Sequence, residues 1–243
     1  MKEIAAALQE WEWLATLPAD ISGFTLVNQL TQCDNQYRIF TYQHGEKQRS
    51  FSVLYDQATK EYLARVIVGL NEYVDINFIA ADLLGLEMIL QERMEYTIRR
   101  LAEFDETTLC TIFREKKITE WVYGRQLPTV IEGFSLYIAP FQPVKVLNGS
   151  YIIIDYTDFI AESSLLVYYN IYRDEFFGEL RVRRTPQVIS TFDTKKINDL
   201  ELQLRDHLEP TVKKLRALLA GSDEETKGEL GNGESIGEGG DGQ

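Results

Sequence analysis

Cysteine and histidine are scarce in this chain, with two of each among 243 residues. Cys33 and Cys110 are too few for a disulfide framework, and we expect both to be reduced, partly buried side chains. His44 and His207 have no cysteine or second histidine near them at the spacing of metal ligands. Without a further base, the sequence offers no Ser-His-Asp or Cys-His catalytic set.

Phosphate-binding motifs are missing as well. No Gly-x-Gly-x-x-Gly or P-loop pattern occurs, and the glycines gather near the C-terminus. Asp155 and Asp158 could form a general-acid pair or a weak cation site, but the polar end of a strand and its turn is the favoured interpretation. We therefore predict no catalytic residue, no metal and no cofactor, and the prediction leans away from an enzyme.

Long apolar runs and an excess of positive charge are also absent. No stretch approaches the ~18 consecutive apolar residues that a membrane-spanning helix needs, and the first residues do not resemble a signal peptide. The 25 basic and 38 acidic residues give a formal net charge of -13, which opposes binding to nucleic acid or to an anionic membrane. We expect a cytoplasmic protein that binds neither.

What the chain does contain is enough apolar material for a core, with 44% apolar and 12% aromatic residues. Disorder of the whole chain is therefore not expected. The charge is concentrated in residues 221–243, where seven acids and one lysine lie in a Gly-rich sequence. This composition predicts a disordered acidic tail over 221–243.

Three ungapped blocks of the sequence recur in the same order, at offsets of 110, 114 and 114 residues. Identical residues occupy 22 of the 65 aligned positions, whereas unrelated chains match at roughly one position in sixteen. The blocks and their counterparts are residues 10–26 and 120–136, 37–68 and 151–182, and 86–101 and 200–215. The sequence therefore predicts a tandem duplication of one ancestral unit, with the two copies over residues 1–104 and 105–220.

Each copy has the same predicted order: a short helix, four strands and a long helix. The turns between the strands are short and rich in turn-forming residues, which favours an antiparallel meander. The predicted short helices are 4–14 and 106–123, and the long helices are 80–104 and 197–219. The predicted strands are 24–31, 36–43, 49–55 and 62–70 in the first copy, and 134–139, 149–157, 163–172 and 176–184 in the second. Together these elements predict an α+β fold.

The two long helices differ at one position, where Tyr96 of the first corresponds to Pro210 of the second. Proline removes a backbone donor and clashes with the preceding turn. We therefore predict that the second helix is kinked, or restarts, near Leu208–Pro210.

The strands of the second copy are apolar on both predicted faces, unlike those of a meander with one solvent-exposed face. One face is expected against the long helix. The other face would pack on the first copy or a second protein, or form a binding surface, unless the strand phase is assigned wrongly. This apolar stripe, the predicted partner-binding site, consists of Ile152, Ile154, Tyr156, Leu166 and Tyr168.

Positive residues gather at the end of the last predicted strand of the second copy. Arg181, Arg183 and Arg184 are candidates for contact with a phosphate or an acidic partner. A solvated sheet edge is the alternative, because charged residues also prevent edge-to-edge association. The pair Arg99-Arg100 has a simpler explanation, since cations favour helix C-termini.

Two functions from different classes follow. The leading prediction is a non-catalytic protein-binding module, adaptor or chaperone-like, whose two copies pack as a pseudo-dimer. The alternative is a small-molecule binding protein or enzyme, with a pocket between long helix and sheet lined by Tyr37, Tyr55, Tyr151 and Tyr169. A homo-oligomer is the third option.

Overall fold

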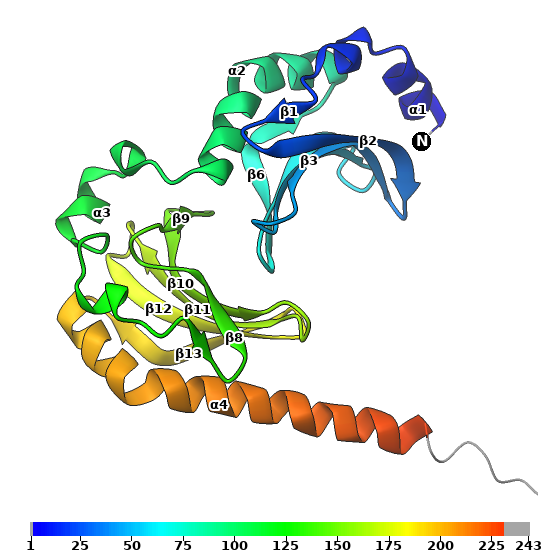
Figure 1. Ribbon diagram of the computed structural model, residues 1–243. Helices are drawn as coiled ribbons and strands as arrows, with labels where there is room; N and C mark the ends of the chain where they lie inside the picture. The colour runs from blue at the N-terminus through cyan, green and yellow to red at the C-terminus, as the bar shows by residue number, and fades with distance from the viewer. Residues whose placement is uncertain (1, 231–243) are drawn as a thin grey trace, which may run out of the picture.

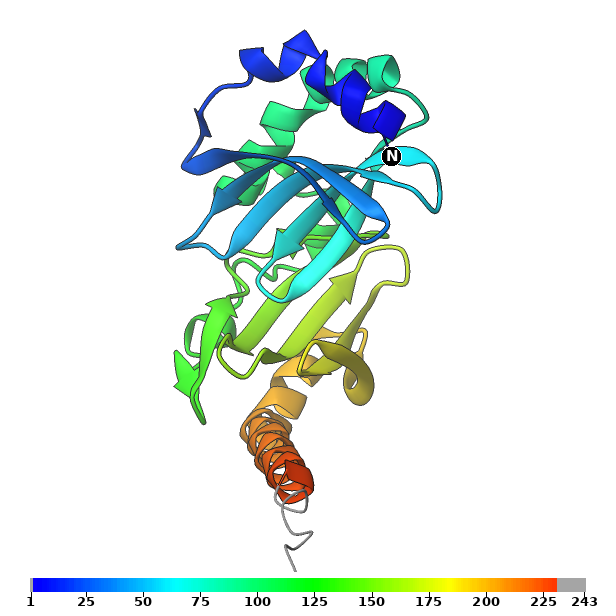
Figure 2. The ribbon, with the colours of Figure 1, turned by 90° about the vertical axis from the view of Figure 1, so that its right-hand side faces the viewer.

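Four layers stack in the computed structural model, which describes residues 2–230, without the side chains of 2, 28, 29 and 222–230. From one end to the other they are helix, sheet, sheet and helix (Figures 1 and 2). The first two layers belong to residues 2–104, here called the N-terminal half, and the last two to residues 105–230, the C-terminal half. The protein is thus an α+β fold with two antiparallel sheets.

The N-terminal half holds a six-stranded antiparallel sheet in chain order, β1-β2-β3-β4-β5-β6. Helix α2 begins at the N-cap Asp82, whose Oδ1 accepts a hydrogen bond from Gly85 N at 2.8 Å. Leu86, Leu90 and Met94 follow at helical spacing and are buried. The elements are α1 (Lys2–Gln9), η1 (Glu12–Thr16), β1 (Asp20–Ile21), β2 (Phe24–Cys33), β3 (Gln36–His44), β4 (Arg49–Asp56), β5 (Glu61–Val68), β6 (Asn71–Ala80) and α2 (Leu83–Ala102).

The C-terminal half holds a seven-stranded antiparallel sheet of order β13-β12-β11-β10-β8-β7, with β9 paired to β10 beside this path. Helix α4 covers it on the side away from the N-terminal half (Figure 1). The elements are η2 (Glu106–Thr108), α3 (Thr111–Glu115), η3 (Tyr123–Arg125), β7 (Val130–Ile131), β8 (Phe134–Ile138), β9 (Val144–Lys145), β10 (Ser150–Asp158), β11 (Ser163–Asn170), β12 (Glu175–Val182), β13 (Thr185–Thr194) and α4 (Ile197–Leu230).

The predicted four-stranded meander is too short, because each half adds a fifth long strand before its long helix. These strands, β6 and β13, each form one edge of their sheet. Much of each lies exposed, so neither has the continuous apolar character of the strands beside it. The short helices are also broken into pieces, most clearly between residues 106 and 125, where two 3-10 turns flank α3.

Corresponding elements recur at constant separations along the chain. Strands β3, β4, β5 and β6 begin and end 114 residues before β10, β11, β12 and β13, and β1 lies 110 residues before β7. Each half also has one hydrogen bond from an indole to its long helix. Trp11 Nε1 donates to Glu87 at 2.6 Å, and Trp121 Nε1 donates to Glu201 at 2.9 Å.

Helix α4 does not restart at Pro210, because it runs without a break from Ile197 to Leu230. Its axis bends in the half that contains this proline (Figure 1), as expected from the lost donor and the clash with the preceding turn. The helix extends into the first ten residues of the predicted disordered tail, 221–230. The rest of the tail, 231–243, lies outside the described residues. Along residues 2–230, no helix has both the length and the apolar character needed to cross a membrane.

A bulge at the same place in both sheets decides which face each side chain occupies. The register of β3 on β4 shifts between Arg38 and Phe40, and that of β10 on β11 shifts between Ile152 and Ile154. The extra residue reverses the alternation of side chains along the strand. Ile152 is therefore opposite Tyr168, whereas Ile154 is opposite Val167, on the other face.

The two halves share a buried interface. One apolar cluster lies wholly within the C-terminal half, but the cluster of the N-terminal half extends to Ile152, Leu166 and Tyr168 of the other sheet. Polar groups also cross the interface, since Arg181 donates to the Leu70 carbonyl at 2.9 Å. The outer face of the second sheet is thus covered by the N-terminal half.

Candidate functional site

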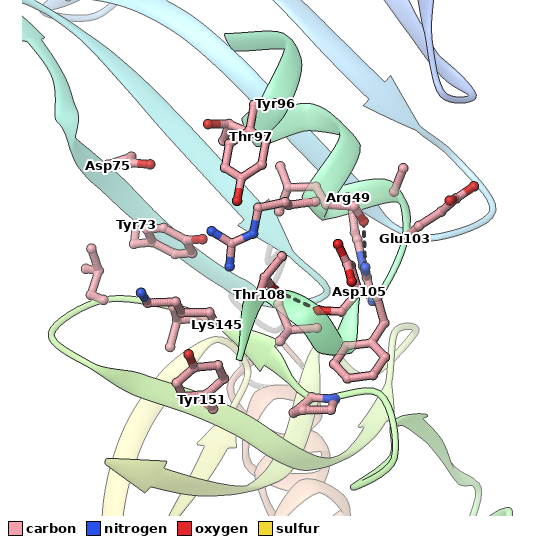
Figure 3. Close-up of a pocket in the computed structure, with 18 of the residues that line it drawn as sticks. Arg49, Tyr73, Asp75, Tyr96, Thr97, Glu103, Asp105, Thr108, Lys145 and Tyr151 are labelled. Atoms are coloured by element: carbon pink, nitrogen blue, oxygen red, sulfur yellow. Dashed lines mark hydrogen bonds between the residues drawn. The ribbon is translucent and has the colours of Figure 1, made fainter. Parts of the chain in front are cut away.

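The principal candidate site is a cleft of about 1130 Å³ where the two halves meet. Its walls are the last turns of α2 and the strand β6 on one side, and the segment from β9 to the start of β10 on the other (Figure 3). The cleft lies beside the interface, at the end of the long helix α2. It differs from the predicted pocket between long helix and sheet in that both halves form its walls.

Helix α2 presents one polar face to the cleft. Arg93, Tyr96, Thr97 and Arg100 line it, at positions i, i+3, i+4 and i+7. These spacings place the four side chains on one side of a helix, while the intervening Ile98 is buried in the core. The hydroxyl-bearing side chains of Tyr96 and Thr97 are shown on this wall in Figure 3.

Strand β6 contributes Tyr73 and Asp75, which lie two residues apart and so share a face. The Asp75 carboxylate accepts hydrogen bonds from the backbone N and the Nδ2 of Asn77, at 3.0 and 2.8 Å. Burial raises the pKa of the Tyr73 phenol well above its usual range. Tyr73 therefore remains a neutral hydrogen-bond donor at any physiological pH.

The C-terminal half supplies Tyr137, Lys145 and Tyr151. Burial raises the pKa of Tyr151 to about 12, so its phenol is also neutral. The Tyr137 phenol joins the two halves: it donates to the Lys47 carbonyl at 2.6 Å and accepts from Arg49 Nε at 3.2 Å. It packs on Gly69, where an added Cβ would approach the ring to 2.7 Å.

Several charged groups around the cleft are already engaged. Lys47 Nζ donates to the carbonyl of Ala102, and Arg49 donates to that of Leu101 at 2.6 Å. Both cations thereby satisfy carbonyls at the end of α2, where the helix dipole favours positive charge. Asp105 accepts hydrogen bonds from Thr107, which hold the pKa of its carboxyl below the usual range.

Two cations that line the cleft, Arg100 and Lys145, are available to a ligand. The half-buried Arg100 guanidinium lies 5.6 Å from the centre of the Tyr96 ring, a cation–π contact. Lys145 is exposed on the opposite wall. Within residues 2–230, neither has a hydrogen bond or an ion pair at its charged group. The cleft can therefore offer two positive groups, and neutral phenols, to a molecule that enters it.

The predicted partner-binding stripe is divided by the bulge in β10. Ile152, Leu166 and Tyr168 face the N-terminal half, whereas Ile154 and Tyr156 belong to the cluster beneath α4. All five are buried, and four of them are fully inaccessible. The error lies in the strand phase: one bulged residue moves the second part of the strand to the opposite face.

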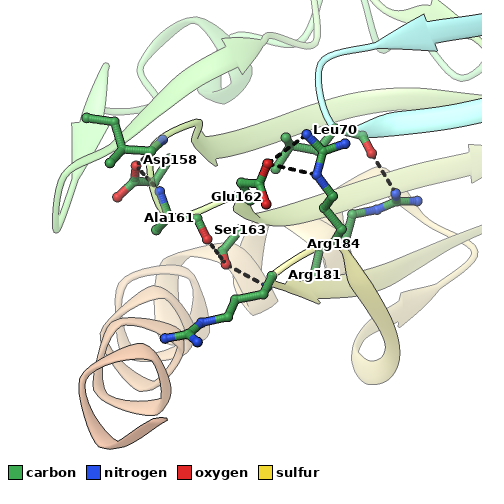
Figure 4. A network of polar contacts seen from close by, with 9 residues as sticks. Leu70, Asp158, Ala161, Glu162, Ser163, Arg181 and Arg184 are labelled. Carbon is green, nitrogen blue, oxygen red and sulfur yellow. Dashed lines mark hydrogen bonds and ion pairs between the residues drawn. The ribbon is translucent and has the colours of Figure 1, made fainter. Parts of the chain in front are cut away.

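The arginines predicted to contact an anion are engaged within the fold, and Figure 4 shows this for Arg181 and Arg184, which have different partners. Arg181 is held by Glu179 at 2.8 Å and by the Leu70 carbonyl. Arg184 pairs with Glu162 at 2.8 Å, and the Arg183 backbone N–H donates to Ser163 Oγ at 2.9 Å. Arg183 and Arg184 form the turn between β12 and β13, both with positive φ.

The four tyrosines of the predicted pocket are buried. Tyr37 donates to the Leu30 carbonyl at 2.9 Å, and Tyr169 donates to Asp174 at 2.7 Å. Only Tyr151 of the four reaches the cleft. Arg100 was visible in the sequence as a helix-terminal cation, but the sequence contains no signal that brings it near Tyr73 and Lys145.

Comparison with known proteins gives no relative: no family model matches the chain, and neither a curated protein nor a solved structure matches it. Among residues 2–230 there is also no group of three or more His, Cys, Asp or Glu side chains suited to a metal ion. The function must therefore be argued from the cleft itself.

Proposed function

We propose that this protein is a ligand-binding protein that holds a small organic molecule in the cleft between its halves. The observation that carries the proposal is the cleft's size together with its lining. A volume of about 1130 Å³ accommodates a drug-sized molecule, and tyrosines from both halves provide apolar faces with polar ends. The proposed role is binding without catalysis.

We also propose that the two halves are tandem copies of one unit, packed as a pseudo-dimer. The constant separations of the strands support this, as do the paired indole–glutamate hydrogen bonds. Another hydrogen bond, from a tyrosine to a proline carbonyl, also occurs once in each half. Tyr42 donates to the Pro18 carbonyl at 2.7 Å, and Tyr156 donates to the Pro128 carbonyl at 2.6 Å. On this proposal the cleft arose at the junction of the copies.

The adaptor or chaperone-like function remains a prediction. The stripe expected to carry it is buried, and we assign no other surface to a protein partner. The cytoplasmic location also remains a prediction.

The proposal can be tested by recording amide NMR shifts of the full chain during titration with a library of small organic fragments. Fragments that bind should shift the amides of residues 73–77, 96–105 and 143–151. In Thr97→Trp, an indole on the cleft wall should abolish these shifts. The matched control Glu95→Trp, on the exposed side of the same helix, should leave them unchanged. Fragments that bind only elsewhere would contradict the proposal.

A further inference from the structure

The charges around the cleft are unevenly distributed. Of its cations, Lys47 and Arg49 are bound to the last carbonyls of α2, and Arg93 pairs with Glu92 at 3.3 Å. Arg100 and Lys145 remain, one from each half of the protein. Arg100 is half-buried, and its guanidinium could form a charge-assisted hydrogen bond with an incoming anion.

Four acids line the cleft: Glu46, Asp75, Glu103 and Asp105. Besides the hydrogen bonds from Thr107, the charge of Arg100 lowers the pKa of Asp105, so this carboxylate already interacts with Arg100. Asp75 accepts from Asn77, as described above. Figure 3 places Glu103 and Asp105 on the side opposite to Lys145 and Tyr151. Lys145 and Tyr151 therefore lie on the part of the cleft away from Glu103 and Asp105.

Neutral hydrogen-bond donors accompany the two cations. Tyr73 and Lys145 lie near each other on one side of the cleft, with Tyr151 below them (Figure 3). The positive charge of Arg100 opposes the rise in pKa that burial causes for Tyr73 and Tyr151, whereas the Asp75 carboxylate adds to the rise at Tyr73 and has the larger effect there. An anion that enters this side of the cleft would meet Lys145 and these two phenols.

Resting on the proposed function, we infer that the ligand is a planar aromatic acid: its carboxylate, sulfonate or phosphate lies between Arg100 and Lys145, and its rings lie against the tyrosines of the cleft. Ring faces are available because Tyr96 and Tyr172 are 58% and 78% exposed. Tyrosine rings favour planar partners through stacking. With a net charge of -13, the protein as a whole repels anions, so selectivity for an acid must come from these local groups.

Two fluorescent probes with the same skeleton test the charge directly. 8-Anilinonaphthalene-1-sulfonate carries a sulfonate that N-phenyl-1-naphthylamine lacks, and both become brighter in apolar sites. We expect the sulfonate probe to bind at least about tenfold more tightly than the neutral one, the usual effect of a charge-assisted hydrogen bond. Arg100→Gln should lower the affinity for the sulfonate probe by about tenfold or more, and leave the affinity for the neutral probe unchanged.

Matched variants separate the cleft from the general surface. Arg99→Gln removes the neighbouring arginine, which is exposed and pairs with Glu95. This substitution should change the affinity for neither probe. Lys145→Gln, at an exposed position with little bearing on folding, should lower the affinity for the sulfonate probe as Arg100→Gln does. Thr97→Trp should remove the binding of both probes.

The outcomes distinguish the inference from the proposed function. If both probes bind the cleft equally well, and Arg100→Gln and Lys145→Gln change neither, the inference is overturned while ligand binding stands. If the sulfonate probe binds but Thr97→Trp has no effect, or if it does not bind at all, the inference is likewise overturned. The fragment titration then decides the proposed function separately.

Discussion

The phenol of Tyr168 donates a hydrogen bond to Asn71 Oδ1 at 3.0 Å, across the boundary between the two halves. Both side chains are buried. The Nδ2 of Asn71 has no partner among the described residues, so this amide depends on Tyr168 for its one side-chain hydrogen bond. The contact links the second sheet to the first residue of β6.

Replacing Tyr168 with phenylalanine should therefore destabilise the protein. The change keeps the ring but removes the hydroxyl and leaves a buried amide unpaired, at a cost of about 1–3 kcal/mol. Urea unfolding followed by circular dichroism measures this loss. Tyr172→Phe is the matched control, since the ring of Tyr172 is mostly exposed, and it should cost under about 0.5 kcal/mol. Equal effects of the two substitutions would contradict the role given to Tyr168.

Gly69 should tolerate no side chain. Its φ of +61° lies in the left-handed region, and an added Cβ would come within 2.7 Å of the Tyr137 ring. We expect Gly69→Ala to lower the free energy of unfolding by about 1–3 kcal/mol, through backbone strain and displacement of Tyr137 from the interface. The melting temperature should fall accordingly.

Gly45→Ala provides the comparison for Gly69. A Cβ at Gly45 meets no atom within 4 Å, and its φ is outside the left-handed region. This variant should melt near the wild-type temperature. A Gly69→Ala protein as stable as Gly45→Ala would show that Tyr137 can move without cost.

Sequence periodicity predicted most of the strands to within a few residues, because each is an apolar run bounded by turn-forming residues. It missed β6, whose mixture of Asn71, Glu72 and Asp75 with apolar residues is typical of an edge strand. It also missed the bulge, because a one-residue insertion leaves no mark in the composition of the strand. That single residue is the reason Ile154 was assigned to the wrong face.

The cleft was beyond prediction for a different reason. Tyr73 and Arg100 lie on β6 and α2 of the N-terminal half, and only the packing of the C-terminal half against it brings Lys145 to the same cleft. Periodicity reports which face of an element is apolar, but it does not report which layers meet. Of the four tyrosines predicted to line a pocket between long helix and sheet, Tyr151 alone lines this cleft.

The paired indole–glutamate hydrogen bonds should contribute similarly to the two halves. Glu87 and Glu201 are each the fifth residue of their helix, and each accepts from an indole of the preceding segment. Glu87→Ala and Glu201→Ala should each cost about 1–2 kcal/mol in the free energy of unfolding. Because the sites are in different halves, the double variant should show the sum. A large effect at one site and none at the other would contradict equivalent roles.

Stability should depend on pH through Asp155, which lies fully buried on the face of the second sheet that meets the N-terminal half. Its Oδ1 accepts from Thr157, while its Oδ2 has no partner among the described residues. Burial raises the pKa of Asp155 to about 7, above the usual 3.8 of an aspartate. The folded protein therefore binds a proton that the unfolded chain has released between these two pH values.

It follows that the free energy of unfolding decreases as pH rises from about 4 to about 7, by an amount on the order of 4 kcal/mol if Asp155 acts alone. Asp155→Asn keeps the shape and cannot ionise, so the difference between its stability and that of the wild type should widen over this range. Urea unfolding at pH 5, 6, 7 and 8 measures the difference. Thr157→Val, which removes the donor that favours the carboxylate, should extend the decrease to higher pH. Parallel pH profiles for the wild type and Asp155→Asn would show that Asp155 keeps one protonation state in folded and unfolded protein alike.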